Sequence, residues 1–182
     1  MTNLAQPLYE RLFADEAANV YAVLDGASVE ELLPKLYDLE PEFECLYRGE
    51  LEPDMAEVAP YLVRLQPETE FADWVLEEGW GRHWGVFAVT DADLRDAHKH
   101  FRSFLTVYDP TGKPLLFRYY DPRVLRVYLP TCDAGELRTV FGPVSCYLLE
   151  GEDPNTLLRF QLSGDALRRE SVPLAEDEDA EA

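Results

Sequence analysis

The sequence predicts a single α/β domain, a mixed β-sheet flanked by helices, with an α+β arrangement as the alternative. Three observations predict this class. Short apolar segments rich in β-branched and aromatic residues alternate with helical periodicity through the first hundred residues, as in domains with a partly parallel sheet. Later apolar segments are joined by turns such as DPTGKP, which indicate an antiparallel portion. With 182 residues, 47% of them hydrophobic, the chain can bury one sizeable core.

Seven strands are expected where short apolar runs are bounded by turn-forming residues. They cover residues 20–24, 43–47, 61–65, 83–90, 115–120, 145–150 and 157–162. In the fifth of these, strand alternation places Phe117 and Tyr119 on one face of the sheet and Arg118 and Tyr120 on the other.

Two helices are expected in the first forty residues. Leucines recur at steps of four within residues 4–14, which favours a helix there. The segment SVEELL, residues 28–33, has the pattern of a capping box, in which Ser28 accepts from the backbone N–H of Glu31. Pro34 is expected to kink or restart this second helix.

The segment DADLRDAHKHFRSFL, residues 91–105, has the clearest helical pattern, because its apolar residues and His98 share one face. His98 and His100 are two residues apart, so on a helix they diverge by about 200° and cannot hold one ion. We therefore expect no metal site. His98 is interpreted as a core histidine, and His100 as an edge residue able to hydrogen-bond a neighbouring strand.

The composition excludes several classes of partner. The chain has 36 acidic and 16 basic residues, a formal charge of −20, which repels nucleic acid and anionic membranes. The domain is expected to span residues 1–170, followed by a disordered acidic tail at 171–182. The acidity of the body favours either a basic partner or solubility.

The sequence favours a cytoplasmic protein that is not an enzyme. The N-terminus lacks a signal-peptide pattern, and no window approaches the roughly 18 apolar residues that cross a bilayer. Cys45, Cys132 and Cys146 are too scattered to indicate a disulfide framework. The sequence has no nucleotide-binding glycine loop and no nucleophile elbow, so we expect no cofactor and no catalytic residues.

Two tryptophans flank the glycine turn in WVLEEGWGRHWG. Trp80 and Trp84 are interpreted as filling the rim of the core, with contact to a partner as the alternative.

The segment FRYYDPRVL concentrates polar groups among aromatic residues. Asp121 followed by Pro122 is typical of a helix entrance, an N-cap acceptor and then a residue suited to the first turn. Arg118 is expected to pair with Asp121, leaving Arg123 at the surface. The enzymatic alternative requires His100, Asp121 and Arg123 to converge in one pocket.

Six segments in order, YAVLDGA, APYLVRL, GWGRHWGVFAVT, HFRSFL, FRYYDPRVL and VFGPV, lie between residues 20 and 148. This set resembles the type VI secretion effector-chaperone family, also called the Tap or Tec adaptors, which was first listed as a domain of unknown function. The resemblance implies a bacterial cytoplasmic protein without enzymatic activity. Such a protein binds a toxic effector and promotes its loading onto the secretion spike, a VgrG-like protein.

The family's motif residues fall here on Arg118, Tyr120, Asp121, Pro122 and Arg123, and on His100 in the preceding helix; the resemblance gives them a structural or partner-binding role. Similar proteins often carry a helical lobe after the sheet domain, whereas this chain ends soon after residue 170. Contacts made by that lobe are therefore not implied.

An acidic immunity or inhibitor protein is the alternative function. The −20 charge favours it, because an acidic surface can occlude the cationic active site of a toxin such as a nuclease.

Overall fold

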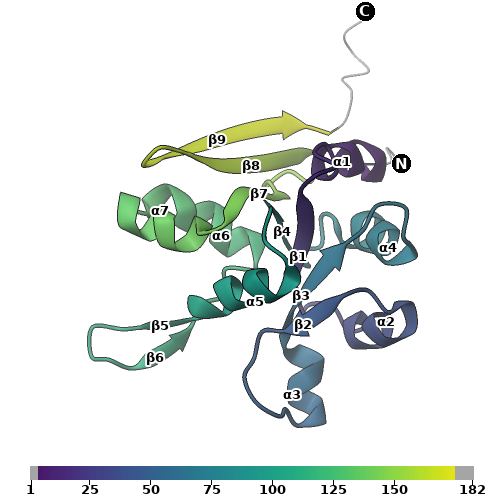
Figure 1. Ribbon diagram of the computed structural model, residues 1–182, viewed down its shortest axis with the longest axis horizontal. Coiled ribbons are helices and arrows are strands. Elements are labelled where there is room, and N and C mark those ends of the chain that lie inside the picture. Colours follow the sequence, from purple (N-terminus) through teal and green to yellow (C-terminus); the bar gives the residue numbers. More distant parts are fainter. Residues whose placement is uncertain (1–3, 175–182) are drawn as a thin grey trace, which may run out of the picture.

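A seven-stranded sheet lies between two layers of helices in the computed structural model, which describes residues 4–174 (Figure 1). The strand order is β2-β3-β1-β4-β7-β8-β9, and a separate two-stranded sheet is formed by β5 and β6. The strands are β1 (Asn19–Asp25), β2 (Phe43–Cys45), β3 (Pro60–Leu65), β4 (Gly85–Thr90), β5 (Thr106–Tyr108), β6 (Pro114–Leu116), β7 (Val144–Glu150), β8 (Thr156–Ser163) and β9 (Ala166–Pro173).

Helices connect most of these strands. They are α1 (Ala5–Leu12), α2 (Leu32–Leu39), α3 (Pro53–Val58), α4 (Glu70–Gly79), α5 (Leu94–Ser103), α6 (Pro122–Tyr128), the short 3₁₀ helix η1 (Leu129–Thr131) and α7 (Ala134–Phe141). The predicted single domain of sheet and helices is confirmed. None of the described helices is both long enough and apolar enough to cross a membrane.

Each face of the sheet buries its own core. In β1, Tyr21 and Val23 face the core beneath α5, α6 and α7, whereas Ala22 and Leu24 face the core beneath α1, α2 and α4. This alternation is what a strand covered on both sides requires. Helix α5 follows its predicted pattern, with Ala97 and Phe101 buried.

The expectation of a partly parallel sheet is wrong, because every strand pair of this sheet within residues 4–174 is antiparallel. The alternation of strands and helices has a different cause. Strands β3 and β4, joined through α4, run in the same direction, but β1 lies between them and pairs antiparallel with both. The connection β3–α4–β4 therefore joins two strands of the same direction, as a crossover in a parallel sheet does. Here, however, the antiparallel strand β1 lies between the two strands that it joins.

Several element boundaries differ from the prediction. Helix α2 begins at Leu32, so Ser28 is not its cap, and Pro34 lies in the first turn, where a missing N–H is tolerated. The strand expected at residues 115–120 stops at Leu116. Strand β9 extends to Pro173, beyond the predicted end of the domain; residues 175–182 of the predicted tail lie outside the described residues.

Candidate functional site

The motif FRYYDPR lies in the loop between β6 and α6 and in the first turn of α6, not in a strand. Tyr119 and Tyr120 are both buried, so the predicted alternation between two faces is wrong. The Tyr119 hydroxyl donates to the carbonyl of Phe101 at 2.8 Å. Tyr120 belongs to the same core, and burial raises its pKa. These two buried rings hold the loop against the core. They thereby position the charged residues on either side of them, Arg118 and Asp121.

Asp121 is the N-cap of α6, as predicted, and Pro122 follows it in the first turn. Its Oδ1 accepts from the backbone N–H of Arg123 at 2.9 Å, and its two oxygens accept from Arg123 Nε and Nη2 at 3.0 and 2.8 Å. Burial alone would raise the pKa of Asp121, but the hydrogen bonds and charge of Arg123, with the charge of Arg118, outweigh it and lower the pKa. Asp121 is thus an ionised cap held by its own helix.

Arg118 pairs with Asp25, not with Asp121 as predicted. Its Nη2 lies 2.6 Å from Asp25 Oδ2, and this hydrogen bond raises the pKa of Arg118. Asp25 is only 2% exposed and also accepts from Ser28 Oγ at 2.9 Å and from the backbone N–H of Ala27 at 3.1 Å. A buried carboxylate requires such partners. Ser28, expected to cap a helix, donates a hydrogen bond to this carboxylate instead.

The topology brings a second ion pair to the same edge of the sheet. Strands β1 and β7 both pair antiparallel with β4, so they run in the same direction and end at one edge, in Asp25 and Glu150. His83 lies two residues before the start of β4 at that edge, and its Nδ1 lies 2.7 Å from Glu150 Oε1. Arg126 of α6 donates to the carbonyl of Gly151 at 2.9 Å. These bonds fasten α6 and the start of β4 to the end of β7.

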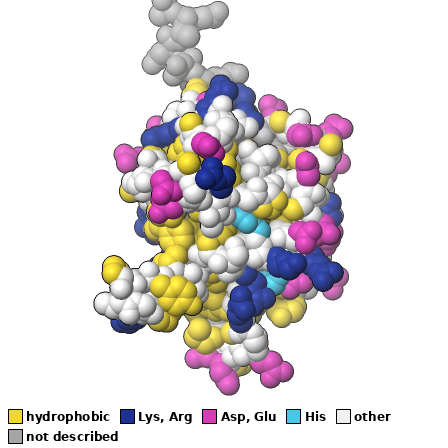
Figure 2. All heavy atoms as spheres, turned by 60° about the vertical axis from the view of Figure 1, so that its left-hand side comes forward, with side chains coloured by type: hydrophobic (Ala, Val, Ile, Leu, Met, Phe, Trp, Pro, Cys, Tyr) yellow, Lys and Arg dark blue, Asp and Glu magenta, His cyan; other side chains and the backbone are white. Residues whose placement is uncertain are grey.

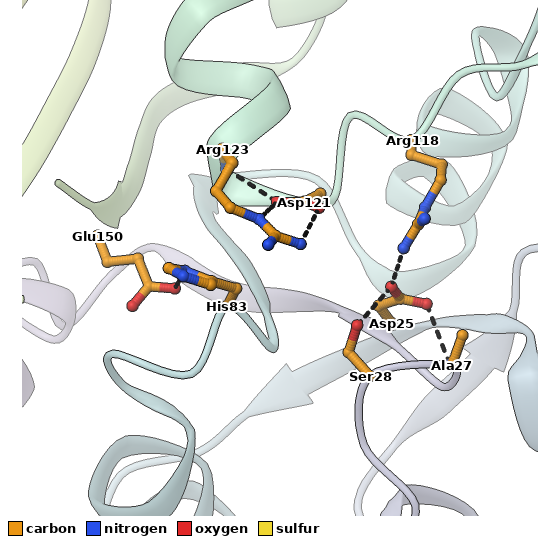
Figure 3. Close-up of polar contacts among 8 residues, drawn as sticks. All are labelled: Asp25, Ala27, Ser28, His83, Arg118, Asp121, Arg123 and Glu150. Atoms are coloured by element: carbon orange, nitrogen blue, oxygen red, sulfur yellow. Dashed lines mark hydrogen bonds and ion pairs between the residues drawn. The ribbon is translucent and has the colours of Figure 1, made fainter. Parts of the chain in front are cut away.

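Figure 3 shows these groups around one end of the sheet, and we call them the edge cluster: Asp25, His83, Arg118, Asp121, Arg123 and Glu150. Its three carboxylates are buried. Its bases reach the surface, since the side chains of Arg118 and Arg123 are 46% and 52% exposed. The cluster therefore joins four parts of the chain through its ion pairs and presents guanidinium groups outward, a form suited to binding carboxylates or carbonyls of another polypeptide.

Three members of the edge cluster were missed by the sequence interpretation: Asp25, His83 and Glu150. A signal was present for the two acids. Asp25 and Glu150 each end an apolar strand run, YAVLD and CYLLE, where a carboxylate at the edge of a buried strand demands a partner. For His83 the only local signal was its position after the glycine turn.

His100 lies apart from the edge cluster. Its Nε2 is 2.9 Å from the carbonyl of Val140, in helix α7 and not in a strand as predicted. Burial lowers the pKa of His100, although this hydrogen bond opposes the effect. Within residues 4–174, no hydrogen bond or ion pair joins His100 to Asp121 or Arg123. The arrangement required for the enzymatic alternative is not seen among these contacts.

Trp80 and Trp84 are half-buried at the rim of the core beneath α1, α2 and α4. Trp80 Nε1 donates to the carbonyl of Pro154 at 2.7 Å, and the rings of Trp74 and Trp84 have centroids 4.8 Å apart. Packing thus accounts for both residues. His98, also interpreted as structural, has its Nε2 2.8 Å from the carbonyl of Cys45.

The described residues contain no group of three or more His, Cys, Asp or Glu side chains placed to hold a metal ion. The three cysteines are free thiols. In a comparison with known families, the family described as a domain of unknown function, DUF4123, matches residues 20–139. Among curated proteins and solved structures, nothing matches this chain. The family match includes α5, the β6–α6 loop and much of the edge cluster.

Proposed function

This chain belongs to the DUF4123 family, and from that premise we propose that it is a type VI secretion adaptor, a chaperone that binds a toxic effector in the cytoplasm and promotes its loading onto the spike protein. The family match over residues 20–139 carries the proposal, because this family is associated with type VI secretion effector adaptors. The protein acts by binding, not by bond-breaking.

The edge cluster supports a binding role. Its carboxylates are occupied by helix capping and by ion pairs that hold the fold. Arg118 and Arg123 form two of these pairs, and only their remaining N–H donors face outward for contact with a partner. Arginine is enriched at protein interfaces because its planar group makes paired hydrogen bonds. The motif residues therefore stabilise the fold of the adaptor, and their exposed donors are also available to bind a partner.

Co-expression tests the proposal. A candidate toxin is chosen from the genes that neighbour this one and is expressed with and without this chain, and its solubility, its co-purification and its secretion into the medium are measured. An adaptor keeps the toxin soluble, co-purifies with it and is required for its secretion. A toxin that stays soluble, remains separate and is secreted equally well in the deletion strain contradicts the proposal.

An inhibitor of the toxin is the second candidate, and the charge of −20 favours it. The two functions differ in one measurement, the activity of the purified toxin. Stoichiometric loss of activity on adding this chain selects the inhibitor, whereas an adaptor that binds away from the active site leaves the activity unchanged.

A further inference from the structure

A hairpin projects from the molecule without packing on the main sheet. Strands β5 and β6 form their own two-stranded sheet and pair only with each other within the described chain. Figure 1 shows this hairpin extending away from the seven-stranded sheet, beside α5. We call residues 106–116 the arm. Every residue of its two strands is exposed.

The arm is apolar on both of its faces. Val107 pairs with Leu115, and Thr106 with Leu116, so Val107 and Leu115 share one face while Tyr108 and Leu116 share the other. The exposed fraction of these four side chains runs from 39% for Val107 to 70% for Tyr108, and they are half of the eight large hydrophobic residues exposed in the described chain. A concentration of apolar surface of this kind marks a place where another molecule binds.

Local hydrogen bonds, not packing, give the arm its shape. At its tip, Asp109 Oδ1 accepts from the backbone N–H groups of Thr111 and Lys113 at 2.8 and 3.0 Å. At its base, the backbone N–H of Phe117 donates to the carbonyl of Leu105 at 2.8 Å, and Leu105 is buried in the core. An isolated hairpin is marginally stable in water. These bonds at both ends hold the apolar side chains ready for binding, which lowers the entropy lost on association.

The charge of the surrounding segment is opposite to that of the protein. Residues 94–128, which comprise α5, the arm and α6, carry seven basic and three acidic side chains, a net charge of +4, whereas the rest of the chain carries nine basic and 33 acidic ones, a net charge of −24. Figure 2 shows hydrophobic side chains gathered beside Lys and Arg side chains on the face that includes the arm. The arm therefore projects from a segment whose net charge is opposite in sign to that of the rest of the chain.

We propose that the arm, with the basic surface of α5 and α6 around it, is the docking surface for an apolar segment of the effector that is flanked by aspartate and glutamate. This inference rests on the proposed adaptor function and names the surface and the chemistry of the partner. Charge complementarity selects the occupant. A second copy of this chain carries a charge of −20 and is repelled as a whole, so the partner is a different polypeptide.

The test compares two double variants that remove similar apolar surface. Tyr108→Ser with Leu116→Ser alters the arm, and Tyr37→Ser with Met55→Ser is the matched control, because these two residues are also exposed but lie in α2 and α3. Affinity for the purified co-expressed toxin is measured by calorimetry. The arm variant is expected to weaken Kd by about tenfold or more, and the control to change it by less than about twofold.

A charge pair tests the basic surface in the same way. Lys99→Glu on α5 is expected to weaken binding and to reduce its dependence on salt, whereas Arg168→Glu, exposed on β9, leaves both unchanged. Circular dichroism and Tm equal to those of the wild type establish that each variant folds.

The outcomes separate this inference from the proposed function. A wild-type protein that does not bind the toxin overturns both. A wild-type protein that binds it, with folded arm variants that bind equally well, overturns the arm as the docking surface and leaves the adaptor function standing. A wild-type dimer that the arm variants convert to monomers, with toxin affinity unchanged, assigns the arm to self-association and also overturns the inference.

Discussion

Arg118 and Asp25 are 93 residues apart in the sequence and form an ion pair of 2.6 Å at one edge of the sheet. The pair fastens the loop before α6 to the end of β1. Because Asp25 is buried and Arg118 is half-exposed, the guanidinium group covers the carboxylate and faces the surrounding solvent with its remaining donors. The Arg118 side chain thus stabilises the fold through its ion pair and also forms part of the exposed surface of the edge cluster.

Arg118→Ala is expected to lower the free energy of unfolding by about 2 kcal/mol, because it leaves the buried Asp25 charge without its ion-pair partner. Urea denaturation measures the change. Arg168→Ala, an exposed substitution in β9, is the control and should cost less than about 0.5 kcal/mol. Adding Asp25→Asn to Arg118→Ala should recover part of the loss, because no buried charge then remains; strictly additive losses would contradict the pairing.

Asp121→Ala is expected to cost about 1 to 2 kcal/mol at pH 7, since it removes the N-cap of α6. The cost depends on pH. The pKa of Asp121 is lower in the folded protein than in the unfolded chain, so its contribution is complete above the unfolded value of about 3.9 and is lost as the pH falls through the folded value. Denaturation curves of the variant and the wild type should converge at low pH; a constant difference would show that the ionised carboxylate is not what stabilises the helix.

His100 should make stability fall as the solution becomes mildly acidic. Its Nε2 carries the proton, because the Val140 carbonyl can only accept. Burial lowers its pKa in the folded state, so the unfolded chain takes up a proton first, and stability is full above about pH 6.5 and declines below it. The free energy of unfolding of His100→Gln, followed from pH 7.5 to 5, should decline less than that of the wild type. Equal slopes would exclude His100 as the source.

Gly142→Ala should destabilise the protein more than Gly49→Ala does. Both glycines have positive φ, +47° and +81°, which strains any other residue. A Cβ at Gly142 would also lie 2.5 Å from His100 Cε1, whereas nothing lies within 4 Å of one at Gly49. Gly49→Ala therefore measures the strain of a positive φ in open space, about 1 kcal/mol. The larger loss in Gly142→Ala combines the strain of its backbone, φ +47° and ψ −117°, with the contact with His100. Thermal denaturation gives both values, and equal losses would show that the imidazole moves aside freely.

Local features of the sequence were predictable, and partners distant in the sequence were not. Asp121 was identified as a cap because a cap needs only its own helix, and α5 was identified because its apolar residues recur with the helical period. The partner of Arg118 was assigned to the nearest carboxylate, Asp121. The true partner lies at the end of β1, and only the sheet topology brings it close.

The strand order of the sheet also depends on partners distant in the sequence and was not predictable from local patterns. Alternating strands and helices predicted a partly parallel sheet, and no local signal indicated that β1 inserts between β3 and β4. Strand β9 was missed because it is an exposed edge strand whose residues include Arg168, Arg169 and Glu170, and it lacks the apolar alternation that marks a half-buried strand.

The insertion of β1 between two later strands also fixes when the protein can begin to fold. Val20 pairs with Leu65 on one side and with Val89 on the other, so during synthesis the first strand waits for its neighbours until half of the chain has left the ribosome. Pairing over such separations is slow. Until β4 has been synthesised, the apolar YAVL strand of the nascent chain lacks at least one of its two neighbours, and this is the stage at which the protein is most exposed to aggregation.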